Sequence, residues 1–184
     1  MEESKPVSYY IPNPDDDPTN ERITRITNKI KIEDLIERSK RIKGCKVFQL
    51  EGRFVNLFNE AYQAYILGMD YTTVSLCALA SERLCYDLIE SSKITFDGRI
   101  ISNIEKESFY RIPFSELVFF SKSIGLLPDK VAGKMMKLNN MRNVYIHPSF
   151  KRDRSDPEKL QIKPESDSVT ALNNLIDIIS GFGK

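Results

Sequence analysis

The chain has 184 residues, of which 41% are hydrophobic, 27 are basic and 26 are acidic. This composition fits a globular protein with its own hydrophobic core and excludes a membrane span, because no apolar run approaches the ~20 residues that such a helix needs. A net charge of +1 excludes an overall positive field that would recruit nucleic acid, and the acidic N-terminus without an apolar stretch predicts a cytoplasmic protein.

Residues 1–29 are predicted to form an extended N-terminal arm, because prolines and a run of three aspartates oppose helix formation. Residues 30–184 are predicted to form a single helical domain with its core at 50–150. The domain is expected to begin with a short amphipathic helix, because apolar residues recur among charged ones between residues 30 and 42, and Gly44 ends this helix.

The strongest periodic signal lies between residues 52 and 92. Two apolar stripes recur there at helical spacing, with Gly68 and Asp70 between them, and predict two long antiparallel helices. The first stripe contains Phe54, Leu57, Phe58, Ala61 and Tyr65, and the second contains Val74, Cys77, Ala78, Ser81, Leu84, Cys85 and Leu88. Each helix is expected to bury its stripe against the other and against a third partner.

Residues 93–112 interrupt this pattern. β-Branched residues flank the dipeptide Asp97-Gly98, which suits the positive φ angles of a tight turn, so we expect a loop or a small hairpin as an insertion.

Three further helices are predicted after this insertion. The first is opened by Pro113 and closed by Gly125, and the second is opened by Pro128 and stopped before Pro148. A final helix at about 168–182 carries an apolar face made of Val169, Leu172, Leu175, Ile176 and Ile179. The sequence therefore predicts an all-α fold.

The cysteines and the single histidine argue against a metal site. Cys77 and Cys85 are eight residues apart on one predicted helix, roughly 12 Å, which is beyond disulfide reach, so both are predicted to be small core residues. The sequence has no Cys-x-x-Cys pair. We therefore expect no metal site and no cofactor.

The only histidine, His147, lies in the stretch KLNNMRNVYIHPSF at the predicted end of a helix. An imidazole with a pKa near ~6.5 can act as acid or base, and the planar guanidinium of Arg142 can grip two phosphate oxygens. On an ideal helix Arg142 and His147 project about 140° apart, whereas Asn143 and His147 are only about 40° apart. Pro148 disfavours helical geometry at His147, which can therefore turn outward as the helix ends.

The spacing Arg-Asn-x-x-x-His at residues 142–147 resembles the motif of HEPN-domain proteins, an Arg followed by four to six residues and a His. The segment EAYQAYILGMDYTTVSLCALASERLCYDLI, with Glu82 in its alanine-rich second half, is similar to the first helical hairpin of that family. IGLLPDKVAGKMMKLNNMRNVYIHP is similar to the stretch that leads into the family's motif helix. The resemblance covers roughly residues 50–150.

The resemblance implies a four- or five-helix bundle that dimerises and brings two motifs together across a symmetry axis. In active HEPN members this composite cleft is a metal-independent endoribonuclease, and many members belong to toxin–antitoxin or phage-defence systems. Others are binding modules without activity. The family therefore predicts the fold better than the function.

Three residues near the motif have alternative interpretations. Asn143 either orients the imidazole or contacts a phosphate, or it caps a local backbone group. Glu82 either holds Arg142 in place or pairs with Arg83, Arg53 or another surface base, and the second alternative is favoured. Tyr145 either stacks on a base or packs in a dimer seam, or it is a packing residue of its own helix, which is favoured.

The first functional hypothesis is a metal-independent endoribonuclease. RNA cleavage without a metal needs a base, an acid and a cation, and a site with two histidines needs a second copy of this chain, so we expect a homodimer that binds RNA. The alternative is a non-catalytic nucleotide- or nucleic-acid-binding module. A third hypothesis is a protein-interaction module, for instance half of an antitoxin pair, whose acidic arm docks on a basic surface. For the chain in general, an antitoxin or a nucleotidyltransferase is the kind of protein partner expected.

Local charge adds little to this choice. Residues 21–46 and 150–163 are basic, which predicts either two modest basic surfaces or solvated charged faces, and the latter is favoured.

Overall fold

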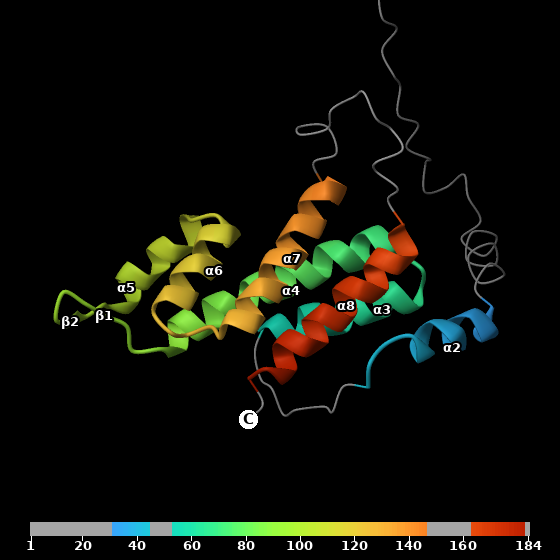
Figure 1. The fold of residues 1–184 in the computed structure, drawn as a ribbon, viewed down its shortest axis with the longest axis horizontal. Coiled ribbons are helices and arrows are strands. Elements are labelled where there is room, and N and C mark those ends of the chain that lie inside the picture. The colour runs from blue at the N-terminus through green and yellow to red at the C-terminus, as the bar shows by residue number, and fades with distance from the viewer. Residues whose placement is uncertain (1–30, 45–52, 147–162, 183–184) are drawn as a thin grey trace, which may run out of the picture. The chain divides into compact units, whose positions relative to one another are not determined.

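The computed structural model describes residues 31–44, 53–146 and 163–182 (Figure 1). The chain divides into two units, residues 1–37 and residues 38–184, and of the first unit only residues 31–37 are described. The predicted arm at 1–29 and His147 lie outside the described residues.

The described part of the chain is predominantly helical, which confirms the all-α prediction; the HEPN-like arrangement stays a prediction. In chain order, the elements are α2 (Ile32–Lys40), α3 (Arg53–Ile66), α4 (Asp70–Ser91), β1 (Thr95–Phe96), β2 (Arg99–Ile100), α5 (Asn103–Lys106), the 3₁₀ helix η1 (Glu107–Arg111), α6 (Phe114–Ser123), α7 (Asp129–Ile146) and α8 (Pro164–Ser180).

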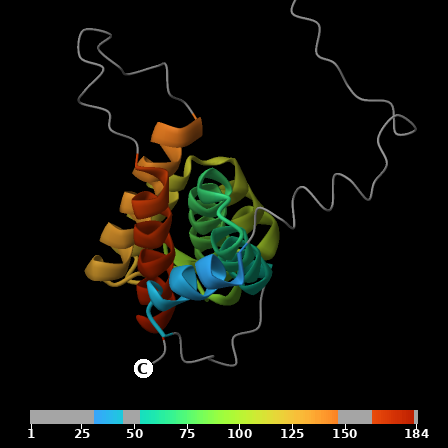
Figure 2. The ribbon, with the colours of Figure 1, turned by 90° about the vertical axis from the view of Figure 1, so that its right-hand side faces the viewer.

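Helix α4 is the central element of the second unit. It packs against α3, α6, α7 and α8, and Figure 2 shows α7 and α8 side by side next to the α3–α4 pair. The predicted stripes supply much of this core, with buried residues that include Phe54, Ala61, Tyr65, Val74, Cys77, Ala78, Ser81, Leu84 and Cys85. The final helix buries Leu172, Leu175, Ile176 and Ile179 of its predicted face, and only Val169 is half-buried.

The link between α3 and α4 needs a glycine. Gly68 has a φ of 75°, and the backbone N–H of Met69 donates to the carbonyl of Ala64 at 2.8 Å, which closes the end of α3. Asp70 was expected in the link but is the first residue of α4, where its negative charge is favourable at the helix N-terminus.

Replacing Gly68 and Gly133 with alanine is expected to change stability in opposite directions. At neither site would an added Cβ come within 4 Å of a described atom outside the adjoining backbone, so backbone conformation decides both results. Gly68→Ala forces a side chain into the left-handed region and should lower the free energy of unfolding by about 1 kcal/mol. Gly133 lies inside α7, where alanine should raise it by about 0.5–1 kcal/mol. Urea unfolding of the two variants measures both changes. If both variants were stabilised or both destabilised, the backbone conformations described for Gly68 and Gly133 would not explain the results.

Residues 93–112 form more structure than was predicted. The expected hairpin is present: Phe96 pairs with Arg99, and the turn residues Asp97 and Gly98 have φ angles of 49° and 75°. The rest of the segment is not a loop, because it forms α5 and η1. A capping box begins α5, in which the Ser102 hydroxyl accepts from the backbone N–H of Glu105 and the Glu105 carboxylate accepts from the backbone N–H of Ser102.

Cys77 and Cys85 are buried and free, as predicted, and burial raises the pKa of the Cys85 thiol to about 12. None of the described helices is both long enough and apolar enough to cross a membrane. Nor do the described residues contain a cluster of three side chains suited to hold a metal ion.

Candidate functional site

The candidate site lies where α4 faces the C-terminal half of α7. Glu82 comes from the middle of α4, whereas Arg142, Asn143 and Tyr145 come from the last two turns of α7. Ile146 is the last described residue of α7, and His147, the next residue in the sequence, lies outside the described residues. The structure brings Glu82 and Arg142 together and places the other motif residues of α7 at the same end of the helix.

Arg142 is fixed by an ion pair across the two helices. Its Nη1 lies 3.0 Å from Oε2 of Glu82, and the two side chains are 26% and 19% exposed. Glu82 therefore pairs with Arg142, and the favoured prediction, a pair with Arg83, Arg53 or another surface base, is wrong. Arg83 instead forms ion pairs with Asp87 at 2.8 Å and Glu90 at 3.4 Å.

Asn139 is a second support that the sequence analysis missed. It is buried one turn before Arg142, and its Oδ1 accepts a hydrogen bond of 3.4 Å from Nη2 of that arginine. The spacing of three residues along a helix was the available signal. Together, Glu82 and Asn139 engage two of the five N–H donors of the guanidinium. Among the described residues nothing else bonds to this side chain, so it is oriented, partly exposed and able to receive an anion.

Asn143 and Tyr145 differ in their surroundings. Asn143 is exposed, and its side chain forms no hydrogen bond within the described ranges. The Tyr145 hydroxyl donates to Oδ2 of Asp167 at 2.6 Å, and its ring meets Tyr71 edge to face at 5.0 Å. Burial, and then the Asp167 carboxylate, raise the pKa of Tyr145. These contacts give Tyr145 a packing role between α4, α7 and α8. Asn143, in contrast, is accessible to a ligand.

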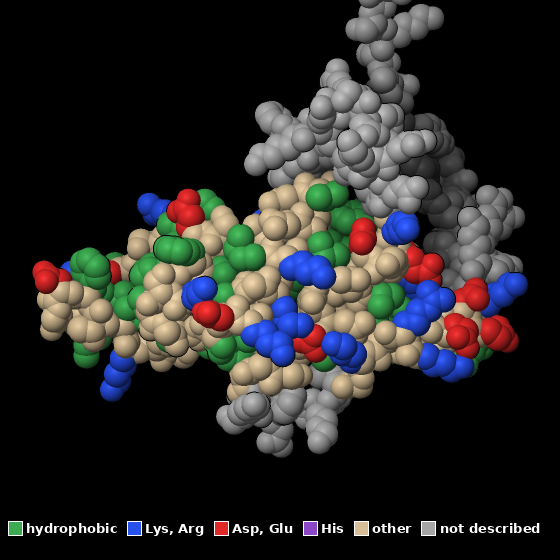
Figure 3. Space-filling view, viewed as in Figure 1, with side chains coloured by type: hydrophobic (Ala, Val, Ile, Leu, Met, Phe, Trp, Pro, Cys, Tyr) green, Lys and Arg blue, Asp and Glu red, His purple; other side chains and the backbone are tan. Residues whose placement is uncertain are grey.

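The surface around these helices carries mixed charge. Figure 3 shows Lys and Arg side chains gathered over parts of α7 and α8, with Asp and Glu side chains among them. Asp177 of α8, for example, accepts hydrogen bonds from Lys43 at 2.9 Å and from Lys134. Burial alone would raise the pKa of Asp177, but these two lysines hold it below its usual range. An anionic ligand would therefore be recognised by particular cations rather than by a field of one sign.

No protein-family model, curated protein or solved structure matches this chain at a significant level. The HEPN-like resemblance therefore rests on the motif and the order of the helices.

Proposed function

We propose that this chain is a metal-independent endoribonuclease that acts as a homodimer, with Arg142 and His147 at the reacting phosphate. The observation that carries the proposal is the Arg142 guanidinium, which Glu82 and Asn139 hold in a partly exposed position five residues before the only histidine. A phosphate needs such a pre-oriented donor, because the fork then loses little entropy when it binds.

The reaction that fits these groups is an internal transfer at phosphorus. A base takes the proton of the ribose 2′-OH, and the 2′-oxygen bonds to phosphorus. The bond from phosphorus to the 5′-oxygen breaks, and an acid gives that oxygen a proton. The products are a 2′,3′-cyclic phosphate and a 5′-hydroxyl. Arg142 would stabilise the charge that builds up on the non-bridging oxygens.

The proposal requires two copies of the chain if both proton carriers are histidines. Each chain contains one histidine, so His147 of one copy would act as base and His147 of the other as acid. Asn143 would position the imidazole or a phosphate oxygen, because it is exposed and one turn before His147.

A role in a toxin–antitoxin or defence system belongs to the same proposal. An endoribonuclease of this kind would need control, and a partner such as an antitoxin or a nucleotidyltransferase would supply it.

A non-catalytic nucleotide- or nucleic-acid-binding module is the second candidate. The ion pair with Glu82 favours it, because a carboxylate at 3.0 Å neutralises part of the charge that Arg142 offers to a transition state. The same cluster would then hold a phosphate without turnover.

Incubation of mixed single-stranded RNA in EDTA is expected to separate these candidates. The wild type should leave 2′,3′-cyclic phosphate ends, and His147→Ala should cut at least about 100-fold more slowly while light scattering still shows a dimer. The control is Lys130→Ala, an exposed residue near the opposite end of α7. Intact RNA with the wild-type dimer would reject the nuclease and favour the binding module.

A further inference from the structure

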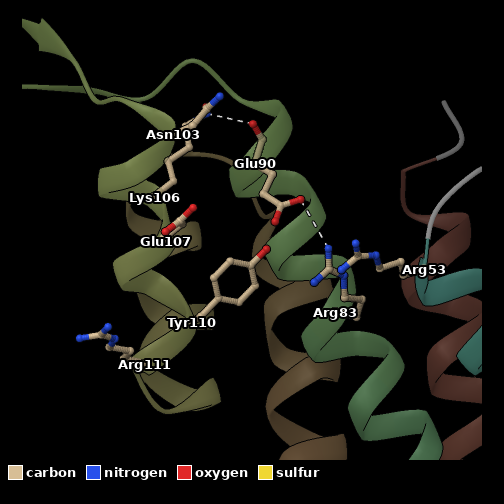
Figure 4. Close-up of a pocket in the computed structure, with 8 residues that line it drawn as sticks. All are labelled: Arg53, Arg83, Glu90, Asn103, Lys106, Glu107, Tyr110 and Arg111. Atoms are coloured by element: carbon tan, nitrogen blue, oxygen red, sulfur yellow. Dashed lines mark hydrogen bonds and ion pairs between the residues drawn. The ribbon is translucent and has the colours of Figure 1, made fainter.

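A second candidate site lies beside the C-terminal half of α4. A cavity of about 660 Å³ opens there between α4, the α5–η1 segment and the start of α3 (Figure 4). It is lined by Arg53, Arg83, Glu90, Asn103, Lys106, Glu107, Tyr110 and Arg111. Its volume lies within the ~300–1,000 Å³ of typical small-ligand sites.

Two of the four cations in this cavity are part of its wall. Lys106 is only 8% exposed, and its Nζ donates to the carbonyls of Glu90 at 2.9 Å and Ser92 at 2.6 Å, which caps the end of α4. Arg83 is held by Asp87 and Glu90. Both side chains are therefore fixed in place before a ligand arrives.

The remaining cations have unused donors. Arg53 and Arg111 are exposed, and neither side chain forms an ion pair or hydrogen bond with another described residue. Nε of Arg83 is buried and has no hydrogen-bond partner within the described ranges either. Four cations face two carboxylates, Glu90 and Glu107, so the cavity suits a ligand with a single phosphate better than a polyanion.

An exposed aromatic ring stands among these charges. Tyr110 is 41% exposed, and Figure 4 shows its ring with Arg53 and Arg83 on one side and Arg111 on the other. The ring is supported by Tyr86 of α4, with centroids 4.6 Å apart, and the guanidinium carbon of Arg83 lies 5.8 Å from its centre. A supported, exposed ring beside arginines is the usual platform on which proteins stack the bases of single-stranded nucleic acids.

Tyr86 of α4 lies between the cavity and the Arg142 site, because it contacts Tyr110 and is one turn from Glu82. At about 100° per residue, Tyr86 projects between Glu82 and Arg83, and it follows Glu82 by one turn, about 6 Å along the helix axis. Burial, and then the negative charge of Glu82, raise the pKa of Tyr86, as expected if the two side chains are neighbours. A short strand of a few nucleotides could thus contact both Arg142 and Tyr110.

We propose that this cavity binds one nucleotide unit of single-stranded RNA, with its base stacked on Tyr110 and its phosphate at Arg53 and Arg83. The placement of that unit in the same strand that reaches Arg142 rests on the proposed function. Asn103 offers an amide to the base edge, and the two carboxylates can accept from amino groups or ribose hydroxyls. A free nucleoside monophosphate has the same chemistry and is the competing source of this ligand.

The test is binding of a short 2′-O-methyl RNA, which lacks the 2′-hydroxyl and therefore cannot be cleaved, to the full chain by fluorescence anisotropy. Tyr110→Ala should weaken binding about fivefold or more, whereas Tyr110→Phe, which keeps the ring, should bind within about twofold of the wild type. The matched control is Tyr62→Ala, because Tyr62 is also exposed but lies on α3 outside the cavity. Arg53→Ala should reduce the slope of log affinity against log salt by about 0.7.

The outcomes separate this inference from the nuclease proposal. If RNA is cut but Tyr110→Ala binds and cuts as the wild type does, the cavity is not a nucleotide site and the nuclease proposal stands. If binding depends on Tyr110 but RNA is never cut, the cavity assignment stands and the nuclease proposal falls. Calorimetry with AMP shows whether the ligand is a unit of RNA or a free nucleotide. If AMP binds as tightly as the RNA, the ligand is a free nucleotide, and the proposal that one strand contacts both this cavity and Arg142 is rejected. If neither RNA nor AMP binds the wild type, the inference is overturned.

Discussion

Arg142→Ala is expected to lower the rate of RNA cleavage by about 100- to 1,000-fold. This range is the usual cost of removing one donor that stabilises charge in a transition state. Of the two groups proposed at the reacting phosphate, Arg142 is the one whose position the structure describes, and Glu82 and Asn139 both hold its guanidinium. Single-turnover cleavage in EDTA measures the loss, and a wild-type rate in this variant would remove Arg142 from the reacting phosphate.

Two further variants separate charge from position. Glu82→Gln keeps the charge of Arg142 but weakens its support, so we expect a smaller loss, roughly tenfold. Arg142→Lys keeps a cation without the planar fork and should recover only part of the activity. If Glu82→Gln instead cuts RNA faster than the wild type, the Glu82 carboxylate lowers the rate by offsetting the charge of Arg142, and this effect outweighs its support of the guanidinium.

A structural loss must be excluded, because Arg142→Ala leaves Glu82 without its partner. Glu82 is 19% exposed, so the unpaired carboxylate should cost about 1–2 kcal/mol and leave the protein folded. Arg99→Ala is the matched control: it also removes an arginine from a glutamate, but this pair, between β2 and Glu105 of α5, is exposed. It should change neither cleavage nor the unfolding transition by a measurable amount.

The helices could be predicted because their signals are local. The apolar stripes at helical spacing predicted α3 and α4, and Gly68 marked the end of α3. Local signals also mark the two places where the prediction differs from the structure. Ser102 and Glu105 have the spacing of a capping box and begin α5, and Pro164 begins α8 four residues before the predicted start at 168.

The site could be predicted only in part, because its contacts join residues far apart in the chain. Arg53, Arg83 and Arg142 were all candidate partners of Glu82, and only the packing of α7 on α4 selects Arg142. The cavity beside α4 was not predicted at all. Tyr110 lies in a segment expected to be a loop or hairpin, and its contact with Tyr86 depends on how η1 folds back onto α4.

Asp70→Ala is expected to lower the free energy of unfolding by about 2–3 kcal/mol. Asp70 forms an ion pair with Arg38, and both side chains are largely buried, at 15% and 14% exposure. It also accepts a hydrogen bond of 2.7 Å from the Ser168 hydroxyl of α8. After removal of the carboxylate, the Ser168 hydroxyl can still donate to the carbonyl of Glu165 at 2.8 Å, whereas the mostly buried guanidinium of Arg38 keeps only the Glu165 carboxylate, 3.7 Å away, as a counter-ion. The cost therefore falls mainly on Arg38.

Further contacts of Arg38 explain why the loss of Asp70 should be costly. Its Nε donates to the carbonyl of Tyr65 at 2.7 Å, its guanidinium carbon lies 4.4 Å from the centre of the Tyr65 ring, and the Tyr65 hydroxyl donates to the carbonyl of Arg38 at 3.0 Å. Arg38 is therefore held in one position and cannot easily move into water when Asp70 is removed.

Asp129→Ala is the matched control for this prediction. Asp129 is also the first residue of a long helix and also forms an ion pair, with Lys122 at 3.2 Å, but its side chain is 85% exposed. Both variants lose a favourable charge at a helix N-terminus, so the difference between them isolates the buried network. Urea unfolding should show a loss of about 0.5 kcal/mol for Asp129→Ala. Equal losses in the two variants would mean that the contacts of Asp70 with Arg38 and Ser168 add no net stability, because their desolvation offsets their attraction.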